Sequence, residues 1–274
     1  MSNKNALMAG KRGLVMGVAN DHSLGWGIAK ALGDAGAELA FTYQVEALGK
    51  RVRPLAESLG SDFVIEADVG SDESLDAVFA EIERRWGRLD FLVHSIAFSD
   101  KNELTGKYVV TSRANFLRTM EISCFSFTDV CRRAVPLMKE GGCLLTLTYA
   151  GAERVMPHYN VMGVAKAALE ASVKYLAADL GGDNIRVNAI SAGPVKTLAS
   201  SAIGDFRYIL KWNELNAPLR RTVTIDEVGN AALYLLSDLG SAVTGECLHV
   251  DAGYHIVGMK AEDAPDIAVG KHDA

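Results

Sequence analysis

The sequence has little basic charge and no long apolar run. Its 34 Asp and Glu residues outnumber its 28 Lys and Arg residues, which gives a formal net charge of −6. Nucleic acid binding needs a basic surface, so we expect no nucleic acid partner. No apolar stretch reaches the roughly 18 residues of a membrane span, and the run at 14–19 is too short for a signal-peptide core. We therefore expect a cytoplasmic protein without a membrane span.

The sequence also lacks paired cysteines and metal-ligand spacing. Its four cysteines, at 124, 131, 143 and 247, lie in apolar segments and form no Cys-x-x-Cys motif. Such cysteines are typical of buried thiols in a reducing compartment. The six histidines are scattered along the chain without the spacing of zinc ligands. We expect neither a disulfide framework nor a metal site.

Short apolar segments alternate with amphipathic segments along most of the 274 residues, of which 49% are hydrophobic. The strand-like segments are 13–17, 38–43, 62–66, 91–94, 143–147, 185–190 and 247–250. Several show no polar alternation, as in parallel strands covered on both faces. Alternating strands and helices favour right-handed crossovers. The pattern predicts an α/β fold: a single doubly wound Rossmann-type domain over residues 1–260, with a parallel seven-stranded sheet and helices on both faces. Residues 261–274 are predicted to form a polar tail of low order.

Capping residues mark two of the predicted helix starts. Ser71 precedes Asp72 and Glu73, so it is a good N-cap with acidic residues in the first turn. Thr224 and Glu227 have the spacing of a capping box. Both patterns support helices on either side of the predicted strands.

The first strand leads into a glycine-containing turn with Gly17, Gly25 and Gly27, followed by a helical segment. Glycines there let the backbone approach a pyrophosphate, which then lies at the helix N-terminus. The spacing is not Gly-x-Gly-x-x-Gly, and taken alone a structural tight turn explains it equally well. Its place between the first strand and the first helix favours dinucleotide binding.

Tyr159 and Lys166 are seven residues apart, nearly two helical turns, so they are predicted to share one helix face. Helical side chains lean toward the N-terminus, which lets Lys166 reach back toward the phenol and lower its pKa. An isolated pair of this kind is more often an ordinary helix with a surface lysine. Here Tyr149 follows the segment 143–147, at the edge where open α/β sheets bind their ligands.

Several longer stretches carry a family resemblance. They are 41–44 (Phe-Thr-Tyr-Gln), 94–98 (His-Ser-Ile-Ala-Phe), 149–166, 187–194 (Val-Asn-Ala-Ile-Ser-Ala-Gly-Pro) and 218–224. With them the sequence resembles the short-chain dehydrogenase/reductase superfamily over residues 8–259. Within it, the sequence resembles the NADH-dependent enoyl-acyl-carrier-protein reductases of bacterial type II fatty acid synthesis. Ordinary superfamily members have three residues between Tyr and Lys and a catalytic Ser about a dozen residues before the Tyr. In that region this chain has Thr146, Thr148 and Tyr149.

The resemblance implies an oxidoreductase that uses NADH to reduce the trans-2 double bond of enoyl thioesters on acyl carrier protein, the last step of the elongation cycle. Its catalytic residues would be Tyr149, Tyr159 and Lys166. Tyr159 would hydrogen-bond the thioester oxygen as an enolate forms, and Lys166 would orient the cofactor. The implied cofactor-binding residues are Gly17, Ser23, Leu24, Gln44, Asp68, Val69, Ile96, Lys166, Val195, Lys196, Thr197, Leu198 and Ala199, while Ser99 would border the acyl pocket.

The residues after the second strand bear on cofactor choice. Enzymes that use NADP usually place Arg or Lys there, and enzymes that use NAD an acidic residue. This chain has neutral Tyr43 and Gln44, with Lys50 and Arg51 at least a turn into the next helix. The sequence therefore predicts a preference for NADH over NADPH.

The segment 161–180 is apolar or small on most faces, so it is predicted to contact both the sheet and a second subunit. The resemblance implies a homotetramer. Residues 197–218 lack a strand pattern and are expected to form a flap over the acyl chain. An acidic carrier would need a basic patch near the pocket mouth, and the candidates are Lys196, Arg207, Lys211, Arg220 and Arg221.

Two alternatives stay open at the level of sequence. One is a carbonyl reductase on the same fold, which the longer Tyr–Lys spacing and the missing Ser disfavour. The other is a dinucleotide-binding regulator without activity, against which Tyr149, Tyr159 and Lys166 argue.

Overall fold

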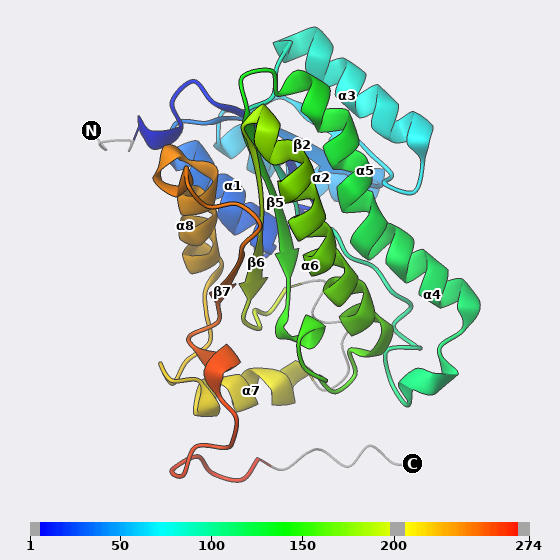
Figure 1. Ribbon diagram of the computed structural model, residues 1–274, viewed down its shortest axis with the longest axis vertical. Helices are drawn as coiled ribbons and strands as arrows, with labels where there is room; N and C mark the ends of the chain where they lie inside the picture. Colours follow the sequence, from blue (N-terminus) through cyan, green and yellow to red (C-terminus); the bar gives the residue numbers. More distant parts are fainter. Residues whose placement is uncertain (1–5, 198–205, 268–274) are drawn as a thin grey trace.

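A computed structural model describes residues 6–197 and 206–267 and shows one seven-stranded sheet (Figure 1). Its strands are β1 (Arg12–Met16), β2 (Glu38–Tyr43), β3 (Val64–Glu66), β4 (Phe91–His94), β5 (Gly142–Thr148), β6 (Ile185–Ala192) and β7 (Cys247–Val250). They lie in the order β3-β2-β1-β4-β5-β6-β7, and every pair of neighbours is parallel. The predicted doubly wound Rossmann-type fold is confirmed.

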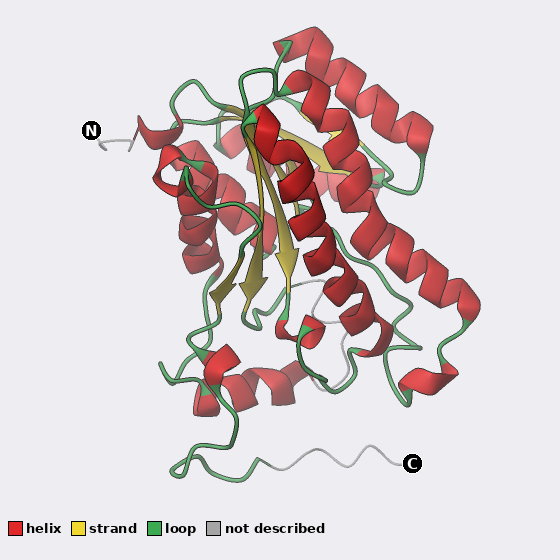
Figure 2. Cartoon of the chain, viewed as in Figure 1, coloured by secondary structure: helices red, strands yellow, loops and turns green. Residues whose placement is uncertain are grey.

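Helices cover both faces of this sheet (Figure 2). The main helices are α1 (Leu24–Asp34), α2 (Glu46–Ser58), α3 (Asp72–Trp86), α4 (Arg113–Met120), α5 (Ser126–Ala134), α6 (Asn160–Leu180), α7 (Phe206–Asn216) and α8 (Ile225–Leu236). One-turn helices lie at Ala6–Met8, Tyr108–Val110, Val135–Leu137, Ala150–Ala152, Gly181–Asp183, Asp238–Gly240 and Tyr254–Ile256, and a π-helical turn at Glu121–Phe125.

The core consists of two layers, one on each face of the sheet. Helices α1, α2 and α8 pack against alternate strand residues such as Val15, Val93 and Leu145. Helices α3, α5 and α6 pack against the residues between them, such as Leu14 and Leu92. Because both faces are covered, these strands need apolar residues at consecutive positions. This explains the continuous apolar runs in the sequence.

Local sequence signals place several element ends. Ser71 Oγ accepts a hydrogen bond from the amide of Ser74 at 3.2 Å, and Thr224 forms the capping box with Glu227. The predicted bounds of β2, β4 and β7 match the structure. Strand β3 is two residues shorter than predicted, because only three of its residues pair with β2 at the sheet edge.

The described part of the C-terminal segment packs onto the fold. The Ala261 amide donates to Asn216 Oδ1 at 2.9 Å, and Asp263 pairs with Arg220 at 2.7 Å. Ala264 is buried. Residues 268–274 of the predicted tail lie outside the described residues.

The carboxyl ends of the parallel strands meet at one edge of the sheet, and α7 lies beyond this edge (Figure 1). The turn after β1, the loop after β4, Tyr149 after β5 and the segment after β6 all emerge there. This convergence is where an open α/β sheet forms its ligand crevice.

Candidate active site

A cavity of about 950 Å³ runs along the carboxyl edge of the sheet. Its volume lies near the upper end of the roughly 300–1,000 Å³ of small-molecule sites. Most of the predicted site residues line it: Gly17, Ser23, Leu24, Gln44, Val69, Ile96, Ser99, Tyr149, Tyr159, Lys166, Val195 and Thr197. Asp68 and Lys196 are not among its lining residues. Leu198 and Ala199 lie outside the described residues.

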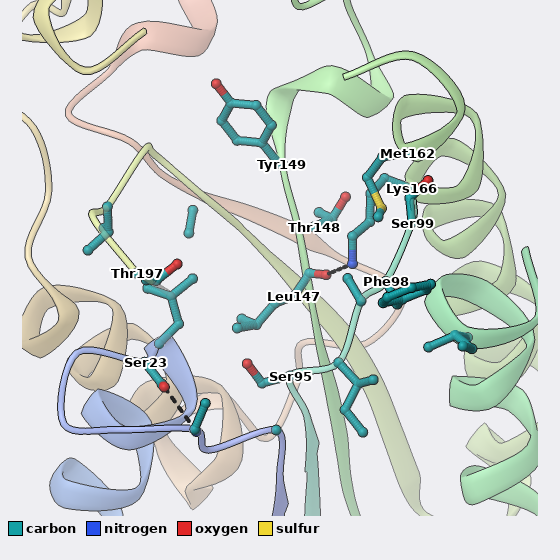
Figure 3. Close-up of a pocket in the computed structure, with 18 of the residues that line it drawn as sticks. Ser23, Ser95, Phe98, Ser99, Leu147, Thr148, Tyr149, Met162, Lys166 and Thr197 are labelled. Carbon is teal, nitrogen blue, oxygen red and sulfur yellow. Dashed lines mark hydrogen bonds between the residues drawn. The ribbon is translucent and has the colours of Figure 1, made fainter. Parts of the chain in front are cut away.

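In the turn after β1, the main chain at Gly17 lies very close to the main chain at Ser95. Gly17 has φ +92°, and a Cβ there would lie 1.9 Å from the carbonyl oxygen of Ser95, so only glycine fits. The turn is closed by Ser23 Oγ, which accepts from the amides of Ala19 and Asn20 at 3.1 Å each (Figure 3). A narrow backbone cradle directly before α1 fits the pyrophosphate of a dinucleotide.

The opposite end of the cavity lies at the ends of β2 and β3, where Tyr43, Gln44 and Val69 line it. Asp68 is exposed, and its Oδ1 accepts from the amide of Gly70 at 3.0 Å. The Asp68 carboxylate therefore shapes its own turn in this structure. Its contact with adenine stays a prediction, as does the cofactor contact of the exposed Lys196.

Tyr159 and Lys166 lie at the start of α6, but only Lys166 is inside the helix. Tyr159 is the N-cap residue, and α6 begins at Asn160. Only Lys166 therefore lies within the helix, which begins one residue after Tyr159, while both side chains line the same cavity. Lys166 Nζ donates to the carbonyl oxygen of Leu147 at 2.8 Å, which fixes the amine against the end of β5 (Figure 3).

Burial controls the protonation of both side chains. Tyr159 is 8% exposed, and desolvation, followed by the nearby Tyr149 and Glu170, raises its pKa well above the ordinary value of a tyrosine. The predicted lowering of the Tyr159 pKa by Lys166 is therefore wrong for the free enzyme. Burial also lowers the pKa of Lys166 to about 8. At neutral pH Tyr159 keeps its proton and is a hydrogen-bond donor.

Tyr149 lies edge-on to Tyr159, with ring centroids 5.2 Å apart. Its hydroxyl points away from Lys166 (Figure 3) and has no hydrogen-bond partner among residues 6–197 and 206–267. Burial raises the pKa of this phenol, so it also stays protonated. An unsatisfied buried hydroxyl costs roughly 1–3 kcal/mol, which a polar group of a ligand would offset.

Buried polar contacts hold the end of β5 in place. Thr148 Oγ1 donates to Glu170 of α6 at 2.7 Å. His94 lies fully buried between Thr146 and Ser126, at 3.2 and 2.8 Å, and burial lowers its pKa to about 3. A neutral His94 therefore adds no positive charge beside the buried ammonium of Lys166.

The cavity has further lining residues that were not predicted as site residues. They are Ser95, Phe98, Leu104, Arg118, Ile122, Leu147, Thr148, Met162, Phe206 and Ile209, with others. Met162 could have been found from its spacing of four residues before Lys166. Ser95 and Phe98 directly follow β4, so the strand-end rule also points to them. Leu104 and Ile122 carry no local signal, because long-range packing brings them to the cavity.

The part of the chain that the structure describes holds neither a candidate metal site nor a candidate membrane span. Among the described residues, no cluster of three or more His, Cys, Asp or Glu side chains could hold a metal ion. Within residues 6–197 and 206–267, no helix has both the length and the apolar character of a bilayer span.

The fold and the site together define a class of protein. A doubly wound parallel sheet, a glycine turn before α1 and a Tyr–Lys pair in a long cavity are the features of a dinucleotide-dependent oxidoreductase. The family pattern described as enoyl-(acyl carrier protein) reductase matches residues 17–255. The chain therefore belongs to the enoyl-(acyl carrier protein) reductase family.

This chain is also similar to individual enoyl-acyl-carrier-protein reductases in sequence and structure. Enoyl-[acyl-carrier-protein] reductase [NADH] 1 of Rhizobium meliloti (strain 1021) is 68% identical over 271 residues, which cover 99% of this chain and 100% of the relative. The crystal structure of the Anaplasma phagocytophilum reductase in complex with NAD has a TM-score of 0.92 and 62% identity, over 96% of this chain and 98% of that one. The Bacillus cereus reductase, solved with NADP+ and indole naphthyridinone, has a TM-score of 0.91 and 54% identity, over 92% and 99%.

Proposed function

We propose that this chain reduces the trans-2 double bond of enoyl thioesters on acyl carrier protein with NADH, the last step of the fatty acid elongation cycle. The predicted enzyme class, activity and cofactor are confirmed at the level of the family, which includes a reductase named for NADH at 68% identity. The observation that carries the proposal is the cavity that runs from Gln44 to Tyr149, Tyr159 and Lys166.

The described residues fit a nicotinamide dinucleotide. The cradle at Gly17 lies between Gln44 at one end of the cavity and the buried Lys166 at the other. When bound, NADH supplies the hydride that reaches C3 of the enoyl group. Leu24, Ile96, Val195 and Thr197 would cover the cofactor between these ends.

Tyr159 is the residue placed to stabilise charge on the substrate. Its buried and protonated hydroxyl donates a hydrogen bond to the thioester oxygen as negative charge develops there. Lys166 uses one of its three N–H groups on Leu147, which leaves two for the nicotinamide ribose. Its ammonium also supplies positive potential beside the developing enolate. Tyr149 and Ser99 line the same cavity, and Ser99 would border the acyl pocket.

The hydrogen bonds of Thr146 and Thr148 argue against a carbonyl reductase. In that class a serine hydroxyl assists the tyrosine. Here the Thr146 hydroxyl is fully buried against His94, and the Thr148 hydroxyl is held by Glu170. Neither threonine is therefore available for the role of that serine.

A spectrophotometric assay tests the reaction. The enzyme should oxidise NADH with crotonyl thioester as substrate and show little activity with acetoacetyl thioester. Preference for the 3-oxo substrate would support the carbonyl reductase. Absence of activity with any enoyl thioester would support a silent dinucleotide-binding protein.

The assembly is proposed as a homotetramer of cytoplasmic subunits, each with one reductase domain over residues 1–260. The inner face of α6 packs on the sheet, while Val164, Ala167, Ala171 and Tyr175 of its outer face are exposed in the single chain. Such a surface fits a second subunit. A monomeric mass in light scattering at micromolar concentration would contradict this part of the proposal.

The acyl carrier protein is proposed to dock near α7, where Phe206 and Ile209 line the cavity. Most of the candidate cations in this region are paired within the chain: Lys211 with Glu214, Arg220 with Asp263 and Arg221 with Glu227. Arg207 is exposed and forms no ion pair with the residues that the structure describes. It is therefore the first candidate for a carrier contact. The same helix would form part of the flap over the acyl chain.

A further inference from the structure

An ion pair at the adenosine end of the cavity has no part in the chemistry proposed above. Glu46 is the first residue of α2, two residues after Gln44. Arg53 Nη1 donates to Glu46 Oε1 at 2.7 Å, and Arg53 Nη2 donates to Oε2 at 2.9 Å. The same Nη2 donates to the Tyr43 hydroxyl at 2.8 Å. The guanidinium also lies over the Tyr43 ring, 4.9 Å from its centroid.

A glycine makes room for this stack. A Cβ on Gly49 would lie 2.9 Å from the Tyr43 ring and 3.1 Å from Arg53 Nη1. Any side chain at this position would push the guanidinium away from the first turn of α2. Gly49 thus lets Arg53 reach back along the helix to Glu46. Tyr43, Gln44 and Leu48 line the cavity beside the stack, whereas Arg53 does not.

The position of this arginine matters for the choice of cofactor. NADPH differs from NADH by a phosphate on the 2′-oxygen of the adenosine ribose, and an arginine near the end of the second strand accommodates that phosphate. A guanidinium binds phosphate through the same two parallel N–H groups with which it binds a carboxylate. In this chain those groups are already bonded to Glu46. Their hydrogen bonds keep the pKa of Glu46 below its usual range, so the carboxylate is charged at neutral pH.

We propose that Glu46 is a specificity-determining residue, which holds Arg53 in an internal ion pair and thereby favours NADH over NADPH. The inference rests on the proposed function and adds to it a residue that acts on the choice of cofactor. Gln44 alone leaves the 2′-position neutral, whereas Glu46 withdraws a guanidinium that the fold brings beside the end of β2.

The test is Glu46→Gln in the full chain, measured with crotonyl thioester and each cofactor. Glutamine keeps the size of the side chain and removes its charge, so residue 46 can accept only a neutral hydrogen bond and holds Arg53 less tightly. Because both side chains of the pair are exposed, the interaction that holds Arg53 on Glu46 is weak, and its loss corresponds to a change of about three- to fivefold. We expect kcat/KM for NADPH to rise by about this factor, and kcat/KM for NADH to change by less than about twofold. Because exposed ion pairs contribute little to stability, the unfolding temperature should stay close to that of the wild type.

A matched control is Glu57→Gln. Glu57 is exposed and lies on the same helix, about 16 Å further along its axis at 1.5 Å per residue. The substitution makes the same change in net charge without touching Arg53. The ratio of the two cofactors should not change.

The double variant Glu46→Gln/Arg53→Met separates a freed arginine from simple loss of repulsion. If Arg53 binds the 2′-phosphate, the gain in kcat/KM for NADPH disappears in the double variant. A gain that persists there would overturn the proposal, because the carboxylate would then act by repulsion alone. Competitive inhibition gives a second readout: Glu46→Gln should bind adenosine 2′,5′-bisphosphate more tightly and AMP unchanged.

The two hypotheses fail in different ways. A wild-type enzyme that does not oxidise NADH with an enoyl thioester would refute the proposed function. A wild-type enzyme active with NADH, together with an unchanged cofactor ratio in Glu46→Gln, would refute only the role of Glu46.

Discussion

The two ends of the cavity hold their polar groups in opposite ways. At the catalytic end, Tyr159 and Lys166 are almost wholly buried and are fixed beside the end of β5. At the adenosine end, Gln44 and Glu46 are exposed, and the charge of Glu46 is compensated by a neighbour on the same helix. The sheet order explains the difference. Strand β5 lies between β4 and β6 inside the sheet, whereas β3 is the edge strand and β2 is next to it. The proposed chemistry thus lies where water is excluded, and the proposed discrimination between cofactors lies where it is not.

The comparison predicts large effects at the buried end, and Tyr159→Phe should give the largest. The ring remains, and only the hydroxyl that is proposed to donate to the substrate oxygen is lost. Removal of one such donor lowers kcat by about 10²–10³. NADH affinity, measured by fluorescence titration, should stay nearly unchanged. A variant that loses NADH affinity but keeps kcat would refute the proposed role of Tyr159.

Lys166→Ala should instead weaken the binding of the cofactor. The amine is held by Leu147, and in the proposed function it contacts the nicotinamide ribose, so its removal would delete hydrogen bonds to the cofactor and a positive charge. Loss of a charge-assisted hydrogen bond predicts a rise in Kd for NADH of roughly 10- to 100-fold. Titration of NADH into the variant measures it. An unchanged Kd with a loss confined to kcat would mean that the roles of Lys166 and Tyr159 are reversed.

The buried lysine also predicts a pH dependence that an exposed lysine would not show. Burial lowers the pKa of Lys166 to about 8, so the cationic form is present below this pH and is lost above it. Because kcat/KM reports the free enzyme, its value for NADH should fall above about pH 8, by roughly tenfold per pH unit. In Tyr159→Phe, the affinity for NADH should still fall above about pH 8, because Lys166 is unchanged. A profile that stays flat through this range would contradict the prediction.

The fold was predictable because its signals are local and periodic. Segments 38–43 and 91–94 have the bounds of β2 and β4, where buried and mostly apolar residues follow one another. Segment 247–250 has the bounds of the half-buried edge strand β7. Ser71 and Thr224 fix their helix starts through hydrogen bonds within three residues. These features need no knowledge of distant residues.

Much of the cavity lining was predictable for a related reason, because parallel strands bring the residues after their carboxyl ends together. The direction of the Tyr159 pKa shift could not be predicted from the sequence, because it depends on burial by residues far apart in the chain. The bond between Glu46 and Arg53 was also missed. It spans seven residues, beyond the usual spacing of three or four for helix partners, and depends on the space above Gly49.

The smallest effects are expected at the exposed rim of the cavity, where α7 carries Arg207 and Lys211. Lys211 Nζ forms an ion pair with Glu214 Oε2 at 3.1 Å, and the two side chains are 50% and 49% exposed. Arg207 has no such partner among residues 6–197 and 206–267. If an acidic carrier docks here, Arg207→Glu should raise KM for carrier-bound enoyl substrate by about three- to tenfold, and Lys211→Glu by less.

The salt dependence and the choice of substrate make this prediction decisive. The rise in KM should be larger at low ionic strength, because salt screens interactions between exposed charges. KM for a small enoyl thioester should hardly change, since it does not touch the rim. Lys139→Glu is the control: this exposed lysine precedes β5 at the amino edge of the sheet, and its reversal changes the net charge without altering the rim. Equal effects of Arg207→Glu on both substrates would mean that Arg207 shapes the acyl pocket, and the division between a buried catalytic end and an exposed docking rim would not hold.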